Sequence, residues 1–559
     1  MLTGLRIQNF KGIKGPIEIP IKPVTLLYGV NSAGKSSVLH SMHFIRALLE
    51  NYDLNPTGSP YAEDDIDLGG FLNLLHKHSV GRRMVLGYSL NLSSIDLPEY
   101  GATSSVSISD KLKEAYVEFG FSADDQDHLP KLDYYLVSLN GADVALVMPD
   151  AVQAAAGKKR LAHINVRHPL LESAAKSVAI DPVEPVIDLE LRKLIPRTED
   201  DDDDLDAELT GASKEEIESR REERKRGLAA EYVLHGEHRD LLKYPVTGFR
   251  NGLPRWGKVV SSPAFDELTG DEFEEGADEV DLLEFTPGVL TELIVGPLEV
   301  LRDLLVDSRA IGPLRAIPKR RSNLDSVTNE AGWYGGLAAW SRLHECSLAQ
   351  LAEVNMWLYD PSRLGTGYSL EREEFREVPL QYLDAVRSCA SPTLNLNWTL
   401  VDALPITRRV WLVDTKNHVR VTPHDVGVGL SQLIPVVAAS VDSHGTLLLI
   451  EQPELHIHPR VQVSLGDLYL QSAAKFGRNF LIETHSEALL LRMMKRIRQT
   501  RDGELPTDVP PASTDDIAVY LIQNEGKGVA VMQMRMNDRG EFLKPWPKGL
   551  FEESLRETF

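Results

Sequence analysis

The stretch VTLLYGVNSAGKSSVLHSM, residues 24–42, places a strand, a glycine-rich turn and a helix in immediate succession. Residues 24–28 are β-prone and mostly apolar, and apolar side chains after the turn recur at helical spacing. Between them, GVNSAGKS at 29–36 fits the pattern G-x-x-x-x-G-K-[ST] in the strand–turn–helix context that this pattern requires. The sequence therefore predicts a phosphate-binding P-loop within an α/β fold.

The residue types in this turn explain how it would hold a phosphate. Glycines let backbone N–H groups turn inward around the anion, and the helix N-terminus adds its partial positive charge. In such loops the lysine, here Lys35, reaches the β- and γ-phosphates, and the next hydroxyl, here Ser36, ligates Mg²⁺. We therefore expect ATP and Mg²⁺ as cofactors, with nucleotide-binding positions at Gly29, Asn31, Ser32, Ala33, Gly34, Lys35, Ser36 and Ser37.

A second apolar strand runs into acidic residues far along the chain, in LLLIEQPELHIHP at 447–459. In P-loop enzymes an acid at the end of a neighbouring strand holds the Mg²⁺. Glu451 follows the apolar run directly and is the predicted metal ligand beside Ser36. We expect its strand to lie next to the P-loop strand.

Two further stretches flank that strand. DVGVGLSQL, residues 425–433, places Gly427, Gly429 and Ser431 ahead of an apolar helix, a second potential anion-binding helix terminus. IETHSE, residues 482–487, places His485 at a strand end, where an imidazole could meet a γ-phosphate. Taken alone, residues 425–433 are more simply a glycine-rich turn, and residues 482–487 are more simply a strand end with a capping Ser or His. Their order along the chain, after a P-loop, favours a nucleotide site.

At this point the sequence resembles a known group of ATPases. NFKGI, YGVNSAGKSS, GVGLSQ, IEQPELHIHP and ETHSE look like the ABC-type heads of the overcoming-lysogenization-defect, RecF and SMC group. IGPLRAIPKR, VNMWL and WPKGLFEE resemble prokaryotic AAA-type ATPases without a nuclease domain, such as ATPase subunits of Septu-like antiphage systems. The resemblance covers about residues 1–80 and 301–559.

The resemblance implies an ABC-type α/β head, with a mixed central sheet, an antiparallel β meander and a helical, partly charged insertion. It also implies head-to-tail pairing, in which ATP on one P-loop is closed by the turn at 427–431 of another subunit. His485 would be the switch histidine, and residues 454–459 would cross the interface. The active unit would be a homodimer or larger oligomer, accompanied by an effector nuclease such as an HNH protein.

Gln452 departs from the family pattern, because ABC heads usually carry a glutamate there as the general base. A neutral amide has no pKa in the range that a base needs, and loss of a base typically costs about 10²–10⁴-fold in rate. Three outcomes stay open. Glu454 or His485 acts as the base, Gln452 only positions the water, or the site binds ATP without turnover. We expect slow hydrolysis.

The net charge of −23 argues against a surface that grips nucleic acid all over. The candidates for local contact are three basic clusters, which are residues 158–160, Arg315 with residues 319–321, and Arg492, Lys495, Arg496, Arg498 and Arg501. The simpler interpretation of each cluster is a solvated face. Two cysteines exclude a disulfide framework and a cysteine-rich zinc site. With no membrane-spanning run and no signal-peptide core, we expect a cytoplasmic protein.

The chain is long enough for more than one core. We expect an ATPase lobe with P-loop and antiparallel meander over 1–190, an acidic and charged insertion over 191–300, and a helical connecting region over 301–420. A second ATPase lobe with the turn, acid strand and histidine follows over 421–505, and a C-terminal module over 506–559. The meander is predicted from alternating strands between about 85 and 150.

These observations favour an ATPase that assembles with ATP and controls an effector nuclease in antiphage defence. Two alternatives remain, a RecF/SMC-like DNA-binding ATPase of DNA repair and a scaffold that ATP holds together without hydrolysis. His456 and His458 could suggest a metal site, but their spacing favours interface or packing roles. Too few residues follow the last predicted helix for a nuclease domain, so we expect the chain itself not to cut nucleic acid.

Overall fold

The computed structural model describes most of the chain. The described residues are 1–59, 62–95, 97–98, 100, 112–123, 128–149, 160–165, 168, 170, 191–195, 241–247, 249–260, 287–318, 330–380, 402–524 and 528–547. The acidic run at 199–206, the basic residues 158–159 and 319–321, and Cys389 lie outside them.

The central sheet carries the P-loop strand. Its order is β14-β18-β19-β3-β20-β21, with all neighbours parallel except β20 and β21. The strands are β14 (Arg309–Ile311), β18 (Leu447–Glu451), β19 (Asn479–Glu483), β3 (Val24–Tyr28), β20 (Ile517–Asn524) and β21 (Val529–Gln533). Each of β3, β18 and β19 is buried along its whole length. Continuous apolar runs form such strands because helices or another sheet cover both faces.

Alternate residues of the sheet feed two separate cores. One core joins Leu27, Leu449 and Leu481 to α1 (Lys35–Asn51), α8 (Gly296–Asp307) and the inner face of the meander. The other joins Leu26, Leu448 and Ile482 to helices on the opposite face. Those helices are α9 (Leu337–Glu345), α10 (Leu348–Tyr359), α13 (Val428–Val441), α14 (Pro459–Phe476) and α15 (Glu487–Asp502). The site therefore stands on a sheet that is packed on both sides.

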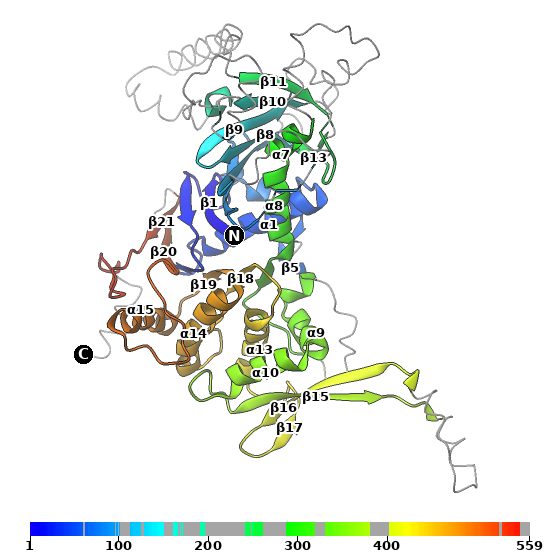
Figure 1. Ribbon diagram of the computed structural model, residues 1–559, viewed down its shortest axis with the longest axis vertical. Helices are drawn as coiled ribbons and strands as arrows, with labels where there is room; N and C mark the ends of the chain where they lie inside the picture. Colours follow the sequence, from blue (N-terminus) through cyan, green and yellow to red (C-terminus); the bar gives the residue numbers. More distant parts are fainter. Residues whose placement is uncertain are drawn as a thin grey trace.

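A second sheet forms the antiparallel meander, in the upper part of Figure 1. Its order is β11-β10-β9-β8-β7-β6-β1-β2. The strands are β1 (Leu2–Gln8), β2 (Ile17–Pro20), β6 (Met84–Asn91), β7 (Glu114–Ala123), β8 (Pro130–Leu139), β9 (Ala142–Pro149), β10 (Arg160–Asn165) and β11 (Leu241–Val246). Strands β6 to β9 occupy the region where the sequence predicts a meander. The expected fold class, an α/β P-loop head with a mixed central sheet and an antiparallel meander, is confirmed.

Several segments join sheets that lie far from them in sequence. Strand β11 belongs to the predicted insertion but pairs with β10 of the meander. Helix α7 (Pro287–Ile294) contacts β9, and α8 contacts α1. Strand β20, from the predicted C-terminal module, pairs directly with the P-loop strand β3. Sequence distance is therefore a poor guide to the partners of these segments.

A three-stranded ribbon projects from the helical side of the molecule (Figure 1). It contains β15 (Tyr368–Arg376), β16 (Ile406–Asp414) and β17 (Val419–Val421), all antiparallel. Strand β17 is followed by a short turn and then by α13. The remaining short elements are β4 (Gly58–Ser59), β5 (Ala62–Asp67), α2 (Phe71–Leu74), η1 (His76–His78), η5 (Leu191–Leu194), β12 (Phe249–Arg250), β13 (Leu253–Pro254) and η8 (Glu330–Trp333).

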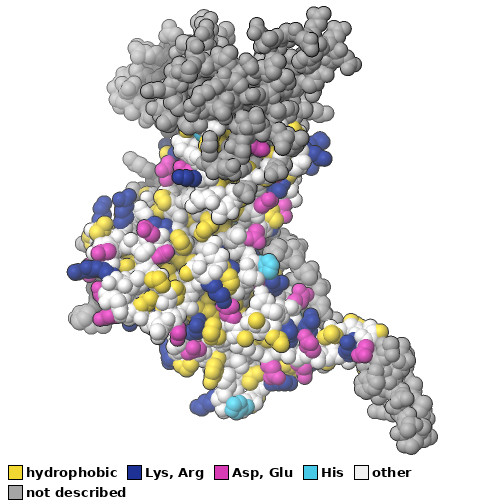
Figure 2. Space-filling model, in the orientation of Figure 1, with side chains coloured by type: hydrophobic (Ala, Val, Ile, Leu, Met, Phe, Trp, Pro, Cys, Tyr) yellow, Lys and Arg dark blue, Asp and Glu magenta, His cyan; other side chains and the backbone are white. Residues whose placement is uncertain are grey.

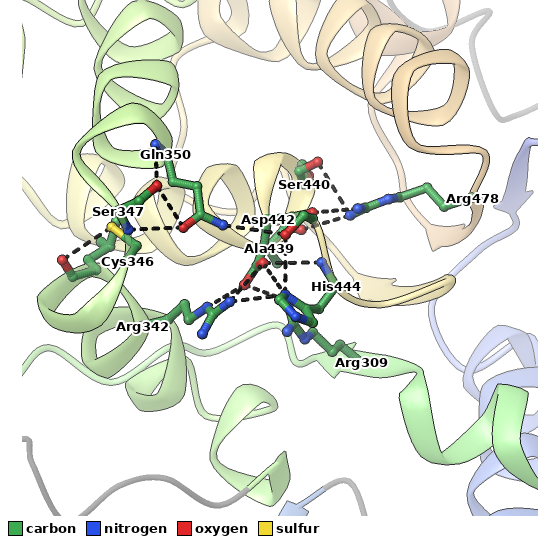
Figure 3. Close-up of polar contacts among 12 residues, drawn as sticks. Arg309, Arg342, Cys346, Ser347, Gln350, Ala439, Ser440, Asp442, His444 and Arg478 are labelled. Carbon is green, nitrogen blue, oxygen red and sulfur yellow. Dashed lines mark hydrogen bonds and ion pairs between the residues drawn. The ribbon is translucent and has the colours of Figure 1, made fainter.

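Asp442, the C-cap of α13, ties three elements together (Figure 3). Its carboxylate accepts a hydrogen bond from Arg342 Nε at 2.8 Å and lies 3.0 Å from Arg309 Nη1. Arg478 donates to the carbonyl of Asp442 and, at 3.2 Å, to that of Ala439. Cations at a helix C-terminus satisfy its last carbonyls and its dipole. This cluster fixes the end of α13 that is remote from the glycine turn.

Candidate nucleotide-binding site

The carboxyl ends of three parallel strands meet at one edge of the central sheet. Strand β19 lies between β3 and β18, so the strand of Glu451 is not the direct neighbour of the P-loop strand. The expectation of direct neighbours was wrong, because strand order within a parallel sheet depends on crossover connections rather than on motif order. The neighbour is β19, which ends at Glu483.

The P-loop backbone needs its glycines where the structure brings other atoms close. A Cβ on Gly29 would lie 2.3 Å from the carbonyl oxygen of Ile522. Gly34 has φ 101°, and a Cβ there would lie 2.7 Å from Val529 Cγ2. Ser32 also has positive φ, at 61°. Asn31 and Ser32 are exposed, whereas Ala33 is buried.

Lys35 and Ser36 both contact Glu483 at the start of α1. The Ser36 hydroxyl donates to Glu483 Oε2 at 2.8 Å, and Lys35 Nζ lies 3.7 Å from Oε1. Lys35 Nζ also donates to the carbonyl oxygens of Gly29 and Val30, at 3.0 and 3.1 Å. Sequence reasoning missed Glu483. The available signal was an acid at the end of an apolar strand, two residues before His485.

Glu451 is buried at the end of β18, in register with Glu483. Its Oε1 accepts a hydrogen bond from the Tyr334 hydroxyl at 3.0 Å. Burial is the larger cause, and the charge of Glu483 the smaller one, of a rise in the pKa of the Glu451 carboxyl to about 7. Ser36, Glu451 and Glu483 thus gather hydroxyl and carboxylate oxygens, the hard donors that Mg²⁺ prefers.

The Gln452 backbone turns sharply away from the strand, with φ 44°. Its N–H donates to the carbonyl of Glu483 at 2.8 Å. Arg315, which is 2% exposed, donates to the carbonyl of Glu451 at 2.8 Å, and its backbone N–H donates to Gln432 Oε1 at the same distance. Burial lowers the pKa of Arg315 to about 10. Sequence analysis placed Arg315 in a basic surface cluster, whereas the structure places it inside the protein, linking α13 to the acid strand.

Glu454 and His485, the candidate bases, lie together. Glu454 Oε1 accepts from the His485 backbone N–H at 2.7 Å, and Oε2 accepts from Thr484 Oγ1 at 2.8 Å. Burial raises the pKa of the Glu454 carboxyl despite these bonds. Burial lowers the pKa of the His485 imidazole, and the charge of Lys35 lowers it further by a smaller amount. His485 therefore stays neutral near pH 7 and keeps a nitrogen that can accept a proton.

The predicted anion-binding turn lies at the N-terminus of α13. Gly427 is the N-cap. Gly429 packs so closely that a Cβ would lie 2.3 Å from the carbonyl oxygen of His456. Ser431 is fully buried, and its hydroxyl donates to the carbonyl of Pro423 at 2.8 Å. The Ser431 side chain thus holds the turn to its own subunit, while Gly427 and Val428 are exposed.

The two histidines of HIHP occupy different positions. His458 is the N-cap of α14, and its Nδ1 accepts from the Arg460 N–H at 3.2 Å. His456 is exposed, with φ 62°. In the part of the chain that the structure describes, no group of three or more His, Cys, Asp or Glu side chains is placed to hold a metal.

The basic cluster of α15 is largely paired within the protein. Arg492 and Arg496 both bind Asp467, at 3.1 and 2.7 Å, and Arg496 is buried. Arg501 pairs with Asp538 at 3.3 Å. Figure 2 shows acidic and basic side chains interspersed over the drawn face. Within the described ranges, no helix has the length and apolarity to cross a membrane.

A family model described as "AAA domain, putative AbiEii toxin, Type IV TA system" matches residues 334–492. This match contains Tyr334, Glu451 and Glu483 but does not include the P-loop at 29–36, and it supports an AAA-type ATPase module. A search of curated proteins gave no match.

Solved SMC heads align over most of the chain with low structural scores. The head from Thermotoga maritima shares 8% identity, with 96% of this chain and 99% of that one covered and a TM-score of 0.33. A head from Pyrococcus yayanosii shares 9%, with 100% and 99% covered and a TM-score of 0.37. A head from Pyrococcus furiosus bound to the C-terminal domain of ScpA shares 10%, with 100% and 98% covered and 0.35. The fold assignment rests on the strand order and the P-loop rather than on these scores.

Proposed function

We propose that the protein is a magnesium-dependent ATPase head that binds ATP at its P-loop and hydrolyses it slowly. The observation that carries this proposal is the contact of Lys35 and Ser36 with the strand-end acid Glu483, which lies in register with a second strand-end acid, Glu451. We assign the phosphates to Lys35, which would exchange its bonds to the P-loop carbonyls for them, and we assign Mg²⁺ to Ser36 and Glu451. The bound Mg²⁺ would neutralise charge on the β- and γ-phosphate oxygens.

Slow turnover follows from the chemistry of the three candidate groups, Gln452, Glu454 and His485. Gln452 can orient water by hydrogen bonding but cannot take its proton. Both oxygens of Glu454 are engaged by Thr484 and the His485 backbone. His485 is the remaining candidate base, and its lowered pKa, caused by burial and by the charge of Lys35, makes it a weak one. We assign water positioning to Gln452 and proton acceptance to His485, with Glu454 holding the His485 segment.

ATP would be closed by a second copy of the chain. The exposed glycine turn stands at the N-terminus of α13, and a helix N-terminus favours an anion. Val428 in this turn and Val30 in the P-loop are both more than half exposed, at 51% and 56%. We propose that Gly427, Gly429 and the α13 terminus of one subunit face the nucleotide of another. Buried Ser431 keeps the turn in shape.

For the biological role, we propose control of an effector nuclease in antiphage defence, the expectation that the sequence resemblance raised. The matching family model is named for a putative toxin of a toxin–antitoxin system. A second candidate function is a scaffold whose subunits ATP holds together without being hydrolysed. This candidate is favoured because Gln452 cannot act as a base and both Glu454 oxygens already accept hydrogen bonds. Direct DNA binding receives less support, because Arg492, Arg496 and Arg501 already pair with acids.

A single-turnover measurement tests this proposal. Purified protein in excess over radiolabelled ATP and Mg²⁺ should bind the label and convert it to ADP slowly. Lys35→Ala should abolish binding. Gln452→Glu, which restores an acid at the position next to Glu451, should raise the rate by about 10²-fold or more.

The outcomes separate the candidates. Bound ATP that stays intact for hours in the wild type, but is hydrolysed by Gln452→Glu, would favour the scaffold. Failure of the wild type to retain any ATP would refute the nucleotide site. Cutting of DNA by the purified protein with metal would refute the division between ATPase and nuclease.

A further inference from the structure

Glu483 stands between the P-loop and the acid that the sequence predicts as the metal ligand. It is paired in register with Leu27 of β3 on one side and with Glu451 of β18 on the other. Residues in register on neighbouring strands project to the same face of the sheet. The carboxylate of Glu483 is therefore nearer to the P-loop than that of Glu451 by one strand spacing, about 4.8 Å.

The contacts of Glu483 involve the two P-loop side chains that matter most. One carboxylate oxygen accepts the Ser36 hydroxyl at 2.8 Å, and the other lies 3.7 Å from Lys35 Nζ. Glu483 is only 4% exposed. A buried carboxylate is costly unless charged or hydrogen-bonded partners meet it. Glu483 thus contacts the Ser36 hydroxyl and the Lys35 ammonium, which are the groups that a P-loop offers to metal and phosphate.

The neighbouring acid makes a cation at this place favourable. Glu451 is also buried, and its side chain accepts from the neutral hydroxyl of Tyr334. Two buried carboxylates on adjacent strands repel each other, and a divalent cation between them would relieve that repulsion. Mg²⁺ is commonly held by one or two carboxylates together with substrate phosphates, not by a cage of protein ligands.

We propose that Glu483 is a second carboxylate of the magnesium site, acting with Ser36 and Glu451 when ATP binds. The inference rests on the proposed function. Before nucleotide binds, Glu483 holds the Ser36 hydroxyl and the Lys35 ammonium in place. When Lys35 turns to the phosphates, the charge of Glu483 becomes available to the cation that accompanies ATP.

This role predicts two effects of opposite sign for Glu483→Gln. Without Mg²⁺, the variant should bind ATP more tightly than the wild type, because a negative charge beside the phosphates is gone. With Mg²⁺, the gain in ATP affinity that the cation brings should shrink. The ratio of the dissociation constant in EDTA to that in Mg²⁺ combines the two effects, and direct measurement of metal binding separates the second from the first.

The experiment measures this ratio for the full chain. A fluorescent ATP analogue is displaced by ATP in EDTA and at saturating Mg²⁺. We expect Glu483→Gln to lower the ratio by about tenfold or more, the scale typical of losing a group that supports a metal site. Glu487→Gln, four residues on and at the start of α15, is the matched control and should leave the ratio unchanged. Mn²⁺ in place of Mg²⁺, followed by electron paramagnetic resonance, should show weaker metal binding in the variant–ATP complex.

An unchanged ratio in Glu483→Gln would overturn the inference and leave Glu483 as an internal partner of Lys35. Thermal unfolding without nucleotide shows whether the variant is folded. If it is not, Glu483→Asp carries the test, with a smaller drop in the ratio expected. A wild type that binds no ATP in either buffer would instead refute the proposed function, and the inference with it.

Discussion

At the scale of single residues, Asp442 is a buried carboxylate whose charged partners contribute to the stability of the fold. Burial alone would raise its pKa, but Arg309, Arg342 and His444 outweigh that effect and lower the pKa to about 2. A carboxyl whose folded pKa is depressed contributes stability above its unfolded pKa, near 4, and loses it as the pH falls through the folded value. The contribution of Asp442 should therefore disappear between about pH 4 and pH 2.

This predicts a pH-dependent difference between wild type and Asp442→Asn. Urea unfolding should show a constant loss of stability in the variant from pH 5 to 7. That loss should shrink by about 2 kcal/mol as the pH is lowered to 2, given 1.36 kcal/mol per pKa unit. Asp538→Asn, which removes an exposed partner of Arg501, should cost no more than about 1 kcal/mol. A difference that does not vary with pH would contradict the assigned pKa.

At the scale of elements, the contact between the start of α13 and the loop after β18 joins the two parts of the site. Gly429 is the point of closest approach, because its missing Cβ leaves room for the carbonyl of His456. Arg315 and Gln432 bridge the same two elements. A change in this contact should therefore move the glycine turn relative to Glu451.

Gly429→Ala would add a methyl group at this contact. Replacing glycine by alanine inside a helix normally stabilises the helix by up to about 1 kcal/mol. Here, however, the new methyl group would lie 2.3 Å from the carbonyl oxygen of His456. We expect a net loss of about 1–3 kcal/mol in the free energy of unfolding, measured by urea denaturation. Gly427→Ala, in the same turn, has φ −61° and nothing within 4 Å of its Cβ, and should change stability by less than about 0.5 kcal/mol. Equal stability of the two variants would refute the close packing.

At the scale of the whole molecule, the proposed assembly joins two copies of an acidic chain. A net charge of −23 on each copy opposes association at low ionic strength. Pairing must therefore depend on local contacts at the nucleotide and on the exposed apolar residues beside it, Val428 and Val30. Association should require Mg²⁺ and ATP and should strengthen with moderate salt.

Light scattering after size exclusion should detect a doubling of mass, or a higher multiple, when ATP and Mg²⁺ are added. Val428→Glu should still bind ATP through its own P-loop but should stay monomeric. Leu348→Glu is a matched control. Leu348 is 70% exposed and starts α10, whose first turn contacts the far end of α13 through Gln350 and Ser443. If the Val428 variant assembles like the wild type, the glycine turn does not form the interface.

The sequence by itself determined the features that depend on neighbours in the chain. The P-loop and its helix, the apolar strands ending at Glu451 and near His485, and the meander follow from spacing, because strand and helix periodicity and turn chemistry are local. Which strands lie side by side was decided only in three dimensions. Crossover connections placed β19 between β3 and β18, and so put Glu483 rather than Glu451 against Ser36. The burial of Arg315 and Ser431 likewise reflects packing between distant segments, for which the local sequence carries no signal.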